Sequence, residues 1–457
     1  MTHFDVLVLG AGSGGYSCAL RAAQLGLSVG LVEKDKVGGT CLHVGCIPTK
    51  ALLHAAEVAD GAREAERYGV RASLEGIDMP AVNAYKDGVV ARLHKGLGGL
   101  ISGRGTTVIE GEGRLTGPLT VTVGDEVHTG TDLVLATGSH AKSLPGLEID
   151  GDKVIASEHA LALDRVPESV IVLGGGVIGC EFASVWRSFG AEVTIVEALP
   201  RLVPAEDAAS SKALERAFRK RGIKFRTGTP FGTVTATDSG VSVTLAGGDT
   251  LAAELLLVAV GRGPNTDGLG FAEAGVTLDR GYVVTDERLR TNLPHTYAVG
   301  DIVPGLQLAH RGFGQGIFVA EEIAGLAPAP LDDAGIPRVT YSHPEVASVG
   351  LTEEQATEQY GAHGVATLTY DLGGNGKSQI LGTQGFVKLV ARPDGPVIGI
   401  HLVGDRVGEL IGEAQLIYGW EARADDVSPL VHAHPTQNEA LGEAHLALAG
   451  KPLHAHS

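Results

Sequence analysis

The sequence predicts an α/β chain that consists of two parallel-sheet units of one design and a separate C-terminal α+β unit. Three observations predict this fold class: a repeated strand–turn–helix–strand segment, several buried strands that end in glycine, and a change of pattern after residue 336. The chain has 457 residues, enough for about three domains. Its 66 glycines are about twice the usual share, and they follow no collagen-like period. We therefore expect many tight turns and close backbone contacts.

The composition excludes several classes of protein. Lys and Arg number 36 against 54 Asp and Glu, and the net charge of −18 is unfavourable for binding nucleic acid or an anionic membrane. No apolar run reaches the ~18 residues of a membrane span. Residues 1–9 carry no Lys or Arg ahead of their apolar stretch, so no secretory signal is predicted and a cytoplasmic location is expected. Four cysteines are too few for a disulfide scaffold.

An internal repeat organises the first two units. Residues 6–33 and 170–197 align at an offset of 164, and eleven of the 28 positions are identical. Each copy reads as an apolar strand, a Gly-x-Gly-x-x-Gly turn, a helix, a glycine, a second strand and a glutamate. A lone glycine triplet often marks only a turn, but here the strand, helix and acid recur in register. The repeat therefore predicts two Rossmann-like dinucleotide-binding domains.

The chemistry of the two copies suggests their ligands. The three glycines of each turn permit a tight turn, the close approach of a pyrophosphate and close packing of the helix, in that order. They are Gly10, Gly12 and Gly15 in the first copy, and Gly174, Gly176 and Gly179 in the second. Glu33 and Glu197 follow at the end of the second strand, where a carboxylate binds ribose hydroxyls. Because a carboxylate repels a 2′-phosphate, FAD and NAD are expected rather than NADP.

Further strands continue this pattern and then change it. The runs 133–138, 256–261 and 297–301 are buried strands that end in glycine, at the edge where a parallel sheet places ligands. From residue 337 on, short strands alternate with helical stretches, which is typical of an α+β domain. The strands are expected at 338–341, 385–391 and 397–403, and the helices at 353–360 and 406–420.

Two of the four cysteines, Cys41 and Cys46, lie five residues apart in the segment GGTCLHVGCIPTK. The alanine-rich residues 51–65 that follow predict a helix. In a regular helix the two Cα atoms would lie roughly 8.7 Å apart, beyond the ~6.8 Å limit for a disulfide. A bridge therefore requires a break, which Gly45 can supply. Two inert thiols, or half of a zinc site with His43 and His54, are alternatives, although no second cysteine pair completes such a site and no metal is expected.

The same segment resembles the redox-disulfide segment of the pyridine nucleotide-disulfide oxidoreductases. The runs 341–350 (YSHPEVASVG) and 432–439 (HAHPTQNE) are similar to the branch of that family that oxidises dihydrolipoamide. The resemblance covers essentially the whole chain. It implies an FAD-binding domain at 1–144, an inserted NAD-binding domain at 145–264, a second part of the FAD domain at 265–336 and a dimerisation domain at 337–457.

The resemblance also implies functional residues by matching position. For FAD these are Gly10, Gly12, Gly15, Glu33, Thr40, Gly113, Thr137, Gly138, Ser139, Asp301, Leu308, Ala309 and His310. For NAD they are Gly174, Gly176, Gly179, Glu197 and Gly261. Lys50 matches the lysine near flavin N5, and Glu181 matches its acidic partner.

The activity that the resemblance implies is oxidation of protein-bound dihydrolipoamide to lipoamide with NAD⁺. His434, oriented by Glu439, would take a proton from the substrate. Cys41 would exchange with the substrate, and Cys46 would pass electrons to FAD. The implied partners are a second copy of the chain, whose disulfide His434 would reach, and the lipoyl domains of 2-oxoacid dehydrogenase acyltransferases or the glycine cleavage H protein.

Other interpretations remain. A related NAD(P)H-dependent disulfide or mercuric reductase is disfavoured by Glu197 and by the absence of cysteines after Cys180. A flavin-bearing redox sensor without turnover is disfavoured because Cys41, Cys46, His434 and Glu439 are all present.

A few residues depart from the family or suggest a second role. His43, Gln315 and Gly263 stand where the family more often has Asn, Glu and Arg. His43 could alter the thiol pKa of Cys41, but a packed or solvated histidine is the preferred interpretation. The tail histidines are interpreted as a solvated terminus, not as a metal tract; these are His445, His454 and His456.

Overall fold

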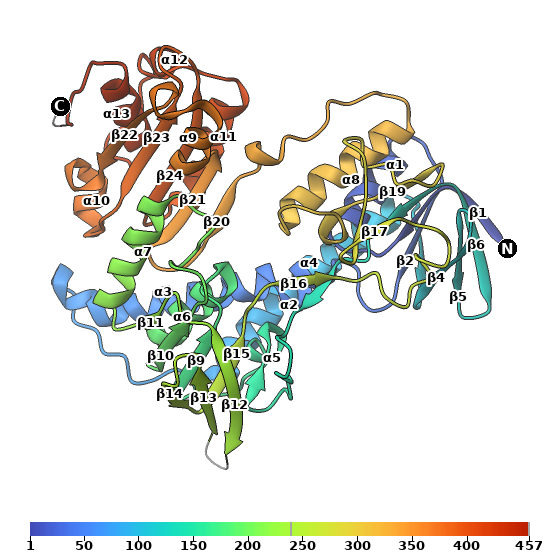
Figure 1. Ribbon diagram of the computed structural model, residues 1–457, viewed down its shortest axis with the longest axis horizontal. Coiled ribbons are helices and arrows are strands. Elements are labelled where there is room, and N and C mark those ends of the chain that lie inside the picture. The colour runs from blue at the N-terminus through green and yellow to red at the C-terminus, as the bar shows by residue number, and fades with distance from the viewer. Residues whose placement is uncertain (238–239, 456–457) are drawn as a thin grey trace.

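The computed structural model describes residues 1–237 and 240–455. Figure 1 shows three groups of strands with their helices: one around the N-terminus, one around β9 and β15, and one that contains the C-terminal residues. The first combines parallel and antiparallel strand pairs, the second is a parallel sheet, and the third is antiparallel. This arrangement confirms the predicted α/β class with a separate α+β unit. The exact domain bounds at 144, 264 and 336 remain predictions.

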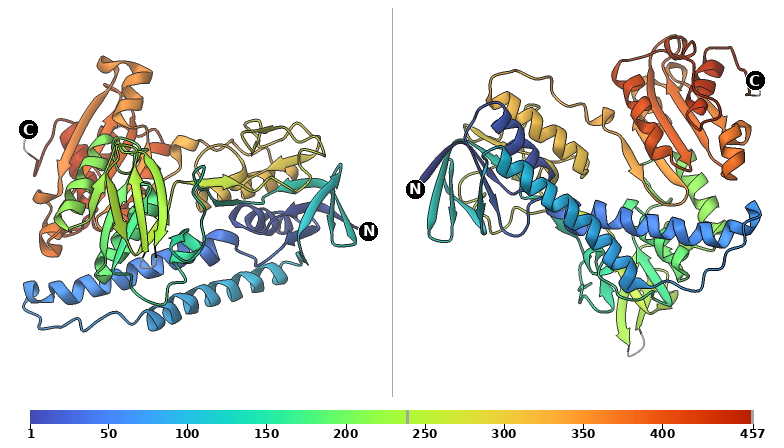
Figure 2. Two further views of the ribbon diagram at one scale, coloured as in Figure 1. Left: turned by 60° about the horizontal axis from the view of Figure 1, so that its bottom comes forward. Right: turned by 180° about the vertical axis from the view of Figure 1, so that it is seen from behind.

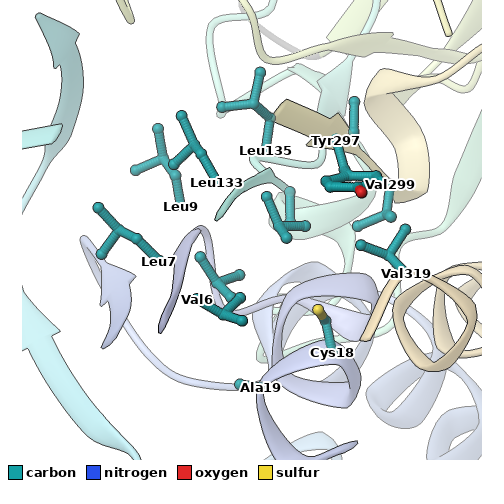
Figure 3. Close-up of a cluster of buried hydrophobic side chains, with 14 of the residues drawn as sticks. Val6, Leu7, Leu9, Cys18, Ala19, Leu133, Leu135, Tyr297, Val299 and Val319 are labelled. Carbon is teal, nitrogen blue, oxygen red and sulfur yellow. The ribbon is translucent and has the colours of Figure 1, made fainter. Parts of the chain in front are cut away.

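The first sheet has the strand order β3-β2-β1-β6-β5-β4, with β19 beside β6. Its strands are β1 (Thr2–Leu9), β2 (Val29–Glu33), β3 (Thr107–Glu110), β4 (Gly113–Gly117), β5 (Thr120–Val123), β6 (Glu126–Leu135) and β19 (Thr296–Ala298). Helices α1 (Ser13–Gln24) and α8 (Ala309–Ile323) pack together against it, and Figure 3 shows Cys18 and Val319 facing the strand residues. Because the central strands are buried on both faces, their sequences are continuous apolar runs.

The second sheet repeats this plan in the order β11-β10-β9-β15-β8. Its strands are β8 (Val154–Ile155), β9 (Ser169–Leu173), β10 (Glu192–Val196), β11 (Lys224–Arg226) and β15 (Leu255–Val258). Its helices are α5 (Ser157–Ala160), α6 (Val177–Phe189) and α7 (Ala208–Lys220). Strand β9 lies between β10 and β15, as β1 lies between β2 and β6, so the sequence repeat is also a structural repeat.

Smaller elements complete and connect the two units. A three-stranded antiparallel sheet consists of β12 (Phe231–Thr237), β13 (Gly240–Leu245) and β14 (Thr250–Ala253). Strand β7 (Ser139–Ala141) pairs with β16 (Arg262–Pro264), which joins the first unit to the end of the second. A short hairpin consists of β17 (Leu278–Asp279) and β18 (Tyr282–Val283).

Two long helices extend along one side of the molecule (Figure 2, left). Helix α3 (Cys46–Glu64) continues into a 3-10 turn (Ala65–Tyr68), and α4 (Met79–Gly103) packs against α3. The predicted helix at 51–65 is confirmed, but it begins earlier, at Cys46. The short helix α2 (Gly39–Val44) precedes it, so the two cysteines lie on different helices.

The C-terminal sheet has the order β20-β21-β24-β23-β22 and is antiparallel throughout. Its strands are β20 (Arg338–Thr340), β21 (Glu345–Gly350), β22 (Ala366–Asp371), β23 (Phe386–Ala391) and β24 (Val397–Gly404). Its helices are α9 (Glu353–Tyr360), α10 (Gly376–Leu381), α11 (Val407–Gly419), α12 (Ala424–Val427) and α13 (Glu439–Leu448). All three predicted strands and both predicted helices are confirmed, whereas β21, β22, α10, α12 and α13 were not predicted from the sequence.

The interpretation of the tail histidines needs correction. His445 is fully buried, because it lies on the inner face of α13 and its Nδ1 binds the carbonyl of Leu441. His454 pairs with Glu443 at 2.8 Å, but its side chain is 65% exposed, which agrees with a solvated terminus. His456 lies outside the described residues. Within the described part of the chain, no helix is long and apolar enough to cross a membrane.

Candidate active site

The two glycine-rich turns have the same backbone geometry. The first glycines, Gly10 and Gly174, are left-handed, with φ of 103° and 110°. A Cβ atom at Gly10 would lie 2.4 Å from the carbonyl oxygen of Ala136, and one at Gly174 would lie 2.3 Å from that of Ala259. Only glycine fits either position without a shift of the backbone.

The middle and last glycines differ in their surroundings. A Cβ atom at Gly12 or Gly176 would meet nothing within 4 Å, so space is open in front of the first turn of α1 and of α6. At Gly15 and Gly179, by contrast, a Cβ atom would lie 1.8 Å and 1.9 Å from a carbonyl oxygen of the same turn. The open space at both helix N-termini fits a pyrophosphate, which backbone N–H groups and the helix dipole would bind.

The glutamates of the two copies are held in the same way. Glu33 accepts a hydrogen bond from the backbone N–H of Ala11 at 2.8 Å, and Glu197 accepts one from that of Gly175 at 2.6 Å. The other carboxylate oxygen of each binds the N–H two residues later. Each carboxylate therefore lies directly beside its turn, with lone pairs left for the hydroxyls of a ribose.

One cavity of about 900 Å³ connects the two turns with the cysteine pair. Most of the residues that the sequence analysis identified line it. They are Gly12, Thr40, Cys41, Cys46, Lys50, Gly138, Ser139, Gly174, Gly176, Glu181, Glu197, Gly261, Asp301, Leu308, Ala309 and His310.

Six other cofactor candidates do not line this cavity: Gly10, Gly15, Glu33, Gly113, Thr137 and Gly179. The three turn glycines Gly10, Gly15 and Gly179 allow the close backbone contacts described above. Thr137 donates a hydrogen bond to the carbonyl of Asn265, and Gly113 is packed under Leu9. Thr137 and Gly113 therefore pack behind the residues that line the cavity.

The cysteine segment contains the break that a bridge requires. Helix α2 ends at Val44 and α3 begins at Cys46, with Gly45 between them at φ −141° and ψ −114°. A Cβ atom at Gly45 would lie 2.8 Å from the carbonyl oxygen of Thr40, so the tight connection depends on glycine. Both cysteines are free thiols.

The surroundings of the pair favour ionisation of one cysteine over the other. The hydrogen bond from Cys41 and the nearby charge of Lys50 lower the pKa of Cys46 to about 7. Cys46 is also the first residue of the 19-residue helix α3, whose positive end favours a thiolate. The same hydrogen bond, together with burial, raises the pKa of Cys41. The reduced pair therefore ionises first at Cys46.

Lys50 and Glu181 form an ion pair at the wall of the cavity. The Lys50 Nζ atom lies 3.0 Å and 2.9 Å from the two carboxylate oxygens of Glu181. Burial alone would lower the pKa of Lys50, but the charge of Glu181 and the hydrogen bonds to it raise the pKa overall. The ring of Tyr341 lies 4.7 Å from Nζ, and its backbone N–H also donates to Glu181. Lys50 thus stays charged beside Cys46.

Another polar group closes the cavity near Asp301. The hydroxyl of Ser139 donates to Asp301 at 2.5 Å and accepts a hydrogen bond from Arg262 at 2.7 Å. Arg262 and Tyr341 are lining residues that the sequence analysis missed. Arg262 directly follows Gly261, and Tyr341 is the first residue of the motif YSHPEVASVG. Their positions next to these motifs could have predicted that they line the cavity.

The three departures have distinct environments. Gln315 accepts the backbone N–H of Gly300 at 2.7 Å through its side-chain oxygen, so it keeps the acceptor that a glutamate would provide. Gly263 lies against the ring of His140 and would place a Cβ atom 2.9 Å from Nε2.

The ring of His43 binds the carbonyl of Val37 at 2.9 Å and packs edge-on against His94. These contacts agree with the interpretation of His43 as a packed residue.

His434 and Glu439 form a dyad in the C-terminal domain, away from the cavity that the described residues enclose. The Nδ1 atom of His434 lies 2.8 Å from Oε1 of Glu439, whose Oε2 accepts the N–H of Thr436 at 2.7 Å. The side chain of His434 is 77% exposed, and on the same loop Val431 is 99% exposed. Within one chain the dyad therefore faces outward.

Comparisons with known proteins identify the family. The family model described as pyridine nucleotide-disulphide oxidoreductase matches residues 4–316, and the model of its dimerisation domain matches residues 336–445. The chain is 41% identical to the dihydrolipoyl dehydrogenase of Bacillus subtilis over 99% of both chains. It is 42% identical to that of Chlorobaculum tepidum over 97% of this chain and 96% of that one. The crystal structure of LpdA from Mycobacterium tuberculosis is 27% identical and superposes with a TM-score of 0.91, covering 98% of this chain and 100% of that chain.

The chain therefore belongs to the pyridine nucleotide-disulphide oxidoreductase family. Its fold is that of the family, with two dinucleotide-binding units and a dimerisation domain. It is an enzyme, its activity is that of a dihydrolipoyl dehydrogenase, and its cofactors are FAD and NAD.

Proposed function

We propose that the enzyme oxidises protein-bound dihydrolipoamide to lipoamide through a redox disulfide between Cys41 and Cys46, and delivers the electrons to NAD⁺. The single observation that carries this assignment is the cavity of about 900 Å³, because both glycine-rich turns and both cysteines line it. A thiol pair at the junction of two nucleotide sites is the arrangement that electron transfer from a dithiol to a nucleotide requires.

The residues present fit the two cofactors. The first turn with Glu33 would hold the adenosine half of FAD, and Asp301 with residues 308–310 would hold the remainder. The second turn with Glu197 would hold NAD. When bound, FAD would supply the two-electron redox chemistry between the reduced cysteine pair and NAD⁺. The protein contributes binding, orientation and proton handling.

The cysteines divide the exchange between them. A substrate thiolate attacks the sulfur of Cys41 in the disulfide, which forms a mixed disulfide and releases Cys46 as a thiolate. The second substrate thiol then displaces Cys41 and closes lipoamide. The pKa of about 7 supports Cys46 as the thiolate that remains, since Lys50 and the N-terminus of α3 stabilise its charge. The ion pair with Glu181 keeps Lys50 protonated at its position.

His434 is the proposed base that takes the proton of the substrate thiol, with Glu439 orienting its ring. A base must come within hydrogen-bond reach of the proton that it removes. Since His434 does not line the cavity of its own chain, we propose that it serves the cavity of a second copy in a homodimer. The dimerisation-domain match at 336–445 and the exposed Leu430 and Val431 on the same loop support this arrangement.

The proposed partners are lipoyl domains, either of 2-oxoacid dehydrogenase acyltransferases or of the glycine cleavage H protein. A lipoyl arm is the form in which dihydrolipoamide is bound to protein. We also propose the division at 1–144, 145–264, 265–336 and 337–457, since the second parallel sheet lies within 145–264, the C-terminal sheet lies within 337–457, and β19 of 265–336 joins the sheet of 1–144.

An assay of the FAD-loaded protein tests the proposal. Dihydrolipoamide should reduce NAD⁺ at a rate that saturates with both substrates, and NADP⁺ should be a much poorer acceptor. A lipoyl domain reduced beforehand should replace free dihydrolipoamide. The proposal fails if the yellow, FAD-loaded protein transfers no electrons from dihydrolipoamide to NAD⁺.

A further inference from the structure

A buried polar row crosses the C-terminal sheet. Arg338, Ser348, His401 and Lys388 are neighbours in register on β20, β21, β24 and β23. Ser348 and His401 are fully buried, and Lys388 is 6% exposed. Polar side chains in such a place are costly unless they are paired, so their partners indicate the purpose of the row.

The partners lie on the second dinucleotide unit, at the start of α7. The Lys388 Nζ atom lies 2.8 Å from Asp207, a residue that is 1% exposed. Ser348 donates to Glu206 at 2.5 Å, and Arg338 lies 3.5 Å from the other oxygen of Glu206. The polar row therefore binds two consecutive acids of the NAD-binding unit.

Lys388 and Asp207 form an ion pair, whereas burial raises the pKa of Glu206. Burial raises the pKa of Asp207, but hydrogen bonds from Lys388 and from two backbone N–H groups lower it overall. Burial lowers the pKa of Lys388, and its bonds to Asp207 and Glu353 raise it overall. Both groups are thus ionised at neutral pH. His401 stays neutral beside them, because burial lowers its pKa to about 4.

The acids end a loop, residues 198–207, that touches the NAD site directly. Leu199 and Pro204 line the cavity, and the N–H of Val203 donates to the carbonyl of Gly175, inside the glycine-rich turn, at 2.7 Å. Arg201 of the same loop forms two hydrogen bonds with Glu354, at 2.9 Å and 2.8 Å. A continuous network of bonds therefore reaches from the C-terminal domain to the turn.

The loop is also strained. Val203 is 2% exposed and has a φ of 41°, a left-handed conformation that is an outlier for a β-branched residue. Such conformations cost roughly 1–3 kcal/mol and persist only where the surrounding structure holds them. Val203 lies between two ion pairs, Arg201 with Glu354 and Asp207 with Lys388, which hold the loop in this conformation.

From this geometry we infer that Lys388, Arg338 and Arg201 are positioning elements of the NAD site: they fix the 198–207 loop from outside so that it presents the glycine-rich turn and Glu197 to NAD. This inference rests on the proposed assignment of NAD to the second turn. The C-terminal domain thus has a role in nucleotide binding in addition to dimerisation.

The test compares Lys388→Met with Lys451→Met in the FAD-loaded enzyme. Lys451 pairs with Asp425 on the exposed surface of the same domain and serves as a matched control. Lys388→Met should raise the KM for NAD⁺ by about tenfold, a coupling of the size found between linked sites. The KM for dihydrolipoamide and the rate at which dihydrolipoamide bleaches the flavin without NAD⁺ should stay unchanged. Lys451→Met should change none of these.

Arg201→Gln provides a second measurement if Lys388→Met fails to take up FAD. Because Arg201 is partly exposed, its replacement should affect folding less than that of Lys388. Arg201→Gln should also raise the KM for NAD⁺. An unchanged KM for NAD⁺ in both variants, or an equal change in both KM values, overturns the inference. A wild-type enzyme that is inactive with NAD⁺ would instead overturn the proposed function.

Discussion

The two dinucleotide units share their turns but differ in the segment after the acid. In the first unit the N–H of Gly38 donates to the carbonyl of Ala11 at 2.8 Å, as that of Val203 donates to Gly175 in the second. Gly38 is left-handed without strain at φ 110°, whereas Val203 is left-handed with a side chain. The first loop leads into α2 and Cys41. The second leads into α7 and the contact with the C-terminal sheet.

This difference shows where a repeated fold acquires separate functions. The turn and the acid are the proposed nucleotide-binding part of each copy, and their backbone geometry is the same in both. The segment after the acid differs between the two copies, since it leads into α2 in the first and into α7 in the second. One copy uses it to bring a thiol pair to the cavity, and the other uses it to connect nucleotide binding to another domain. Substitutions in each unit can test this division, beginning with the largest expected effect.

Loss of either cysteine should abolish turnover but leave different spectra. Cys41→Ser and Cys46→Ser should each lower the rate of NAD⁺ reduction by about 10³-fold or more, because the nucleophile or its partner is gone. On two-electron reduction, Cys41→Ser should keep the thiolate-to-flavin charge-transfer absorbance, and Cys46→Ser should lose it. Identical spectra for the two variants would contradict the separate roles.

His434→Gln should lower the rate by about 10²- to 10⁴-fold, the usual contribution of a general base. The dimer can be tested by mixing this variant with Cys41→Ser after dissociation and reassociation. Each hybrid would hold one site with both changes and one with neither, so activity should approach roughly a quarter of wild type for random pairing of symmetric dimers. If proven hybrids stay inactive, each site is built within one chain.

Glu197→Ala and Glu33→Ala should affect different cofactors. Loss of hydrogen bonds to a charged acceptor costs about 1.5–3 kcal/mol, so Glu197→Ala should raise the KM for NAD⁺ by roughly 10- to 100-fold and ease the entry of NADP⁺. Glu33→Ala should lower the FAD content and leave the KM for NAD⁺ of the loaded fraction unchanged. If Glu197→Ala lowered the FAD content and Glu33→Ala raised the KM for NAD⁺, the assignment of FAD to the first turn and NAD to the second would be reversed.

The pH dependence should follow Cys46. Its pKa is lowered to about 7, so the thiolate is present above this pH and is lost as the pH falls through it. The charge-transfer absorbance of the two-electron-reduced enzyme should titrate accordingly. Lys50→Met should raise the midpoint by about one unit or more, because a nearby positive charge is removed. Lys34→Met, at an exposed lysine, is the control; an unchanged midpoint in Lys50→Met argues against the role of Lys50.

The smallest effect is expected at the middle glycines. Gly176→Ala places a Cβ atom in open space, so stability should change by less than about 0.5 kcal/mol, while the KM for NAD⁺ rises several-fold because the pyrophosphate is kept away. Gly174→Ala should instead destabilise the fold, since its Cβ atom would lie 2.3 Å from a carbonyl oxygen. Thermal unfolding with and without NAD⁺ distinguishes the two variants. If both melt at the same temperature, the backbone of the turn can shift to accommodate a Cβ atom at Gly174.

The sequence predicted those features that depend on local chemistry. The glycine turns, the acids and the break at Gly45 could be read directly because each depends on a backbone that only certain residues allow. Tyr341 and Arg262 lie beside motifs that the sequence shows, but their place in the cavity depends on contacts between elements distant in the chain and was not predicted. The four-residue helix α12 is too short to show a periodic pattern, whereas the edge strand β22 has an alternating pattern (ATLTYD) that the prediction overlooked. His445 looked like a tail residue only because the burial of α13 is a tertiary property.

The contact between Lys388 and Asp207 spans 181 residues of the chain, and this separation has a consequence during synthesis. At about 5–20 residues per second, a ribosome needs roughly 10–40 s to add the lysine after the aspartate. Early in that interval the first dinucleotide unit lacks its second part, which includes β19 and α8, and the 198–207 loop has its own turn but no partner in the C-terminal domain. The nucleotide loop of the nascent enzyme is therefore finished late, when the C-terminal sheet is made. A fragment that ends before residue 338 would carry the whole NAD sequence motif, but the loop would have none of its partners in the C-terminal domain.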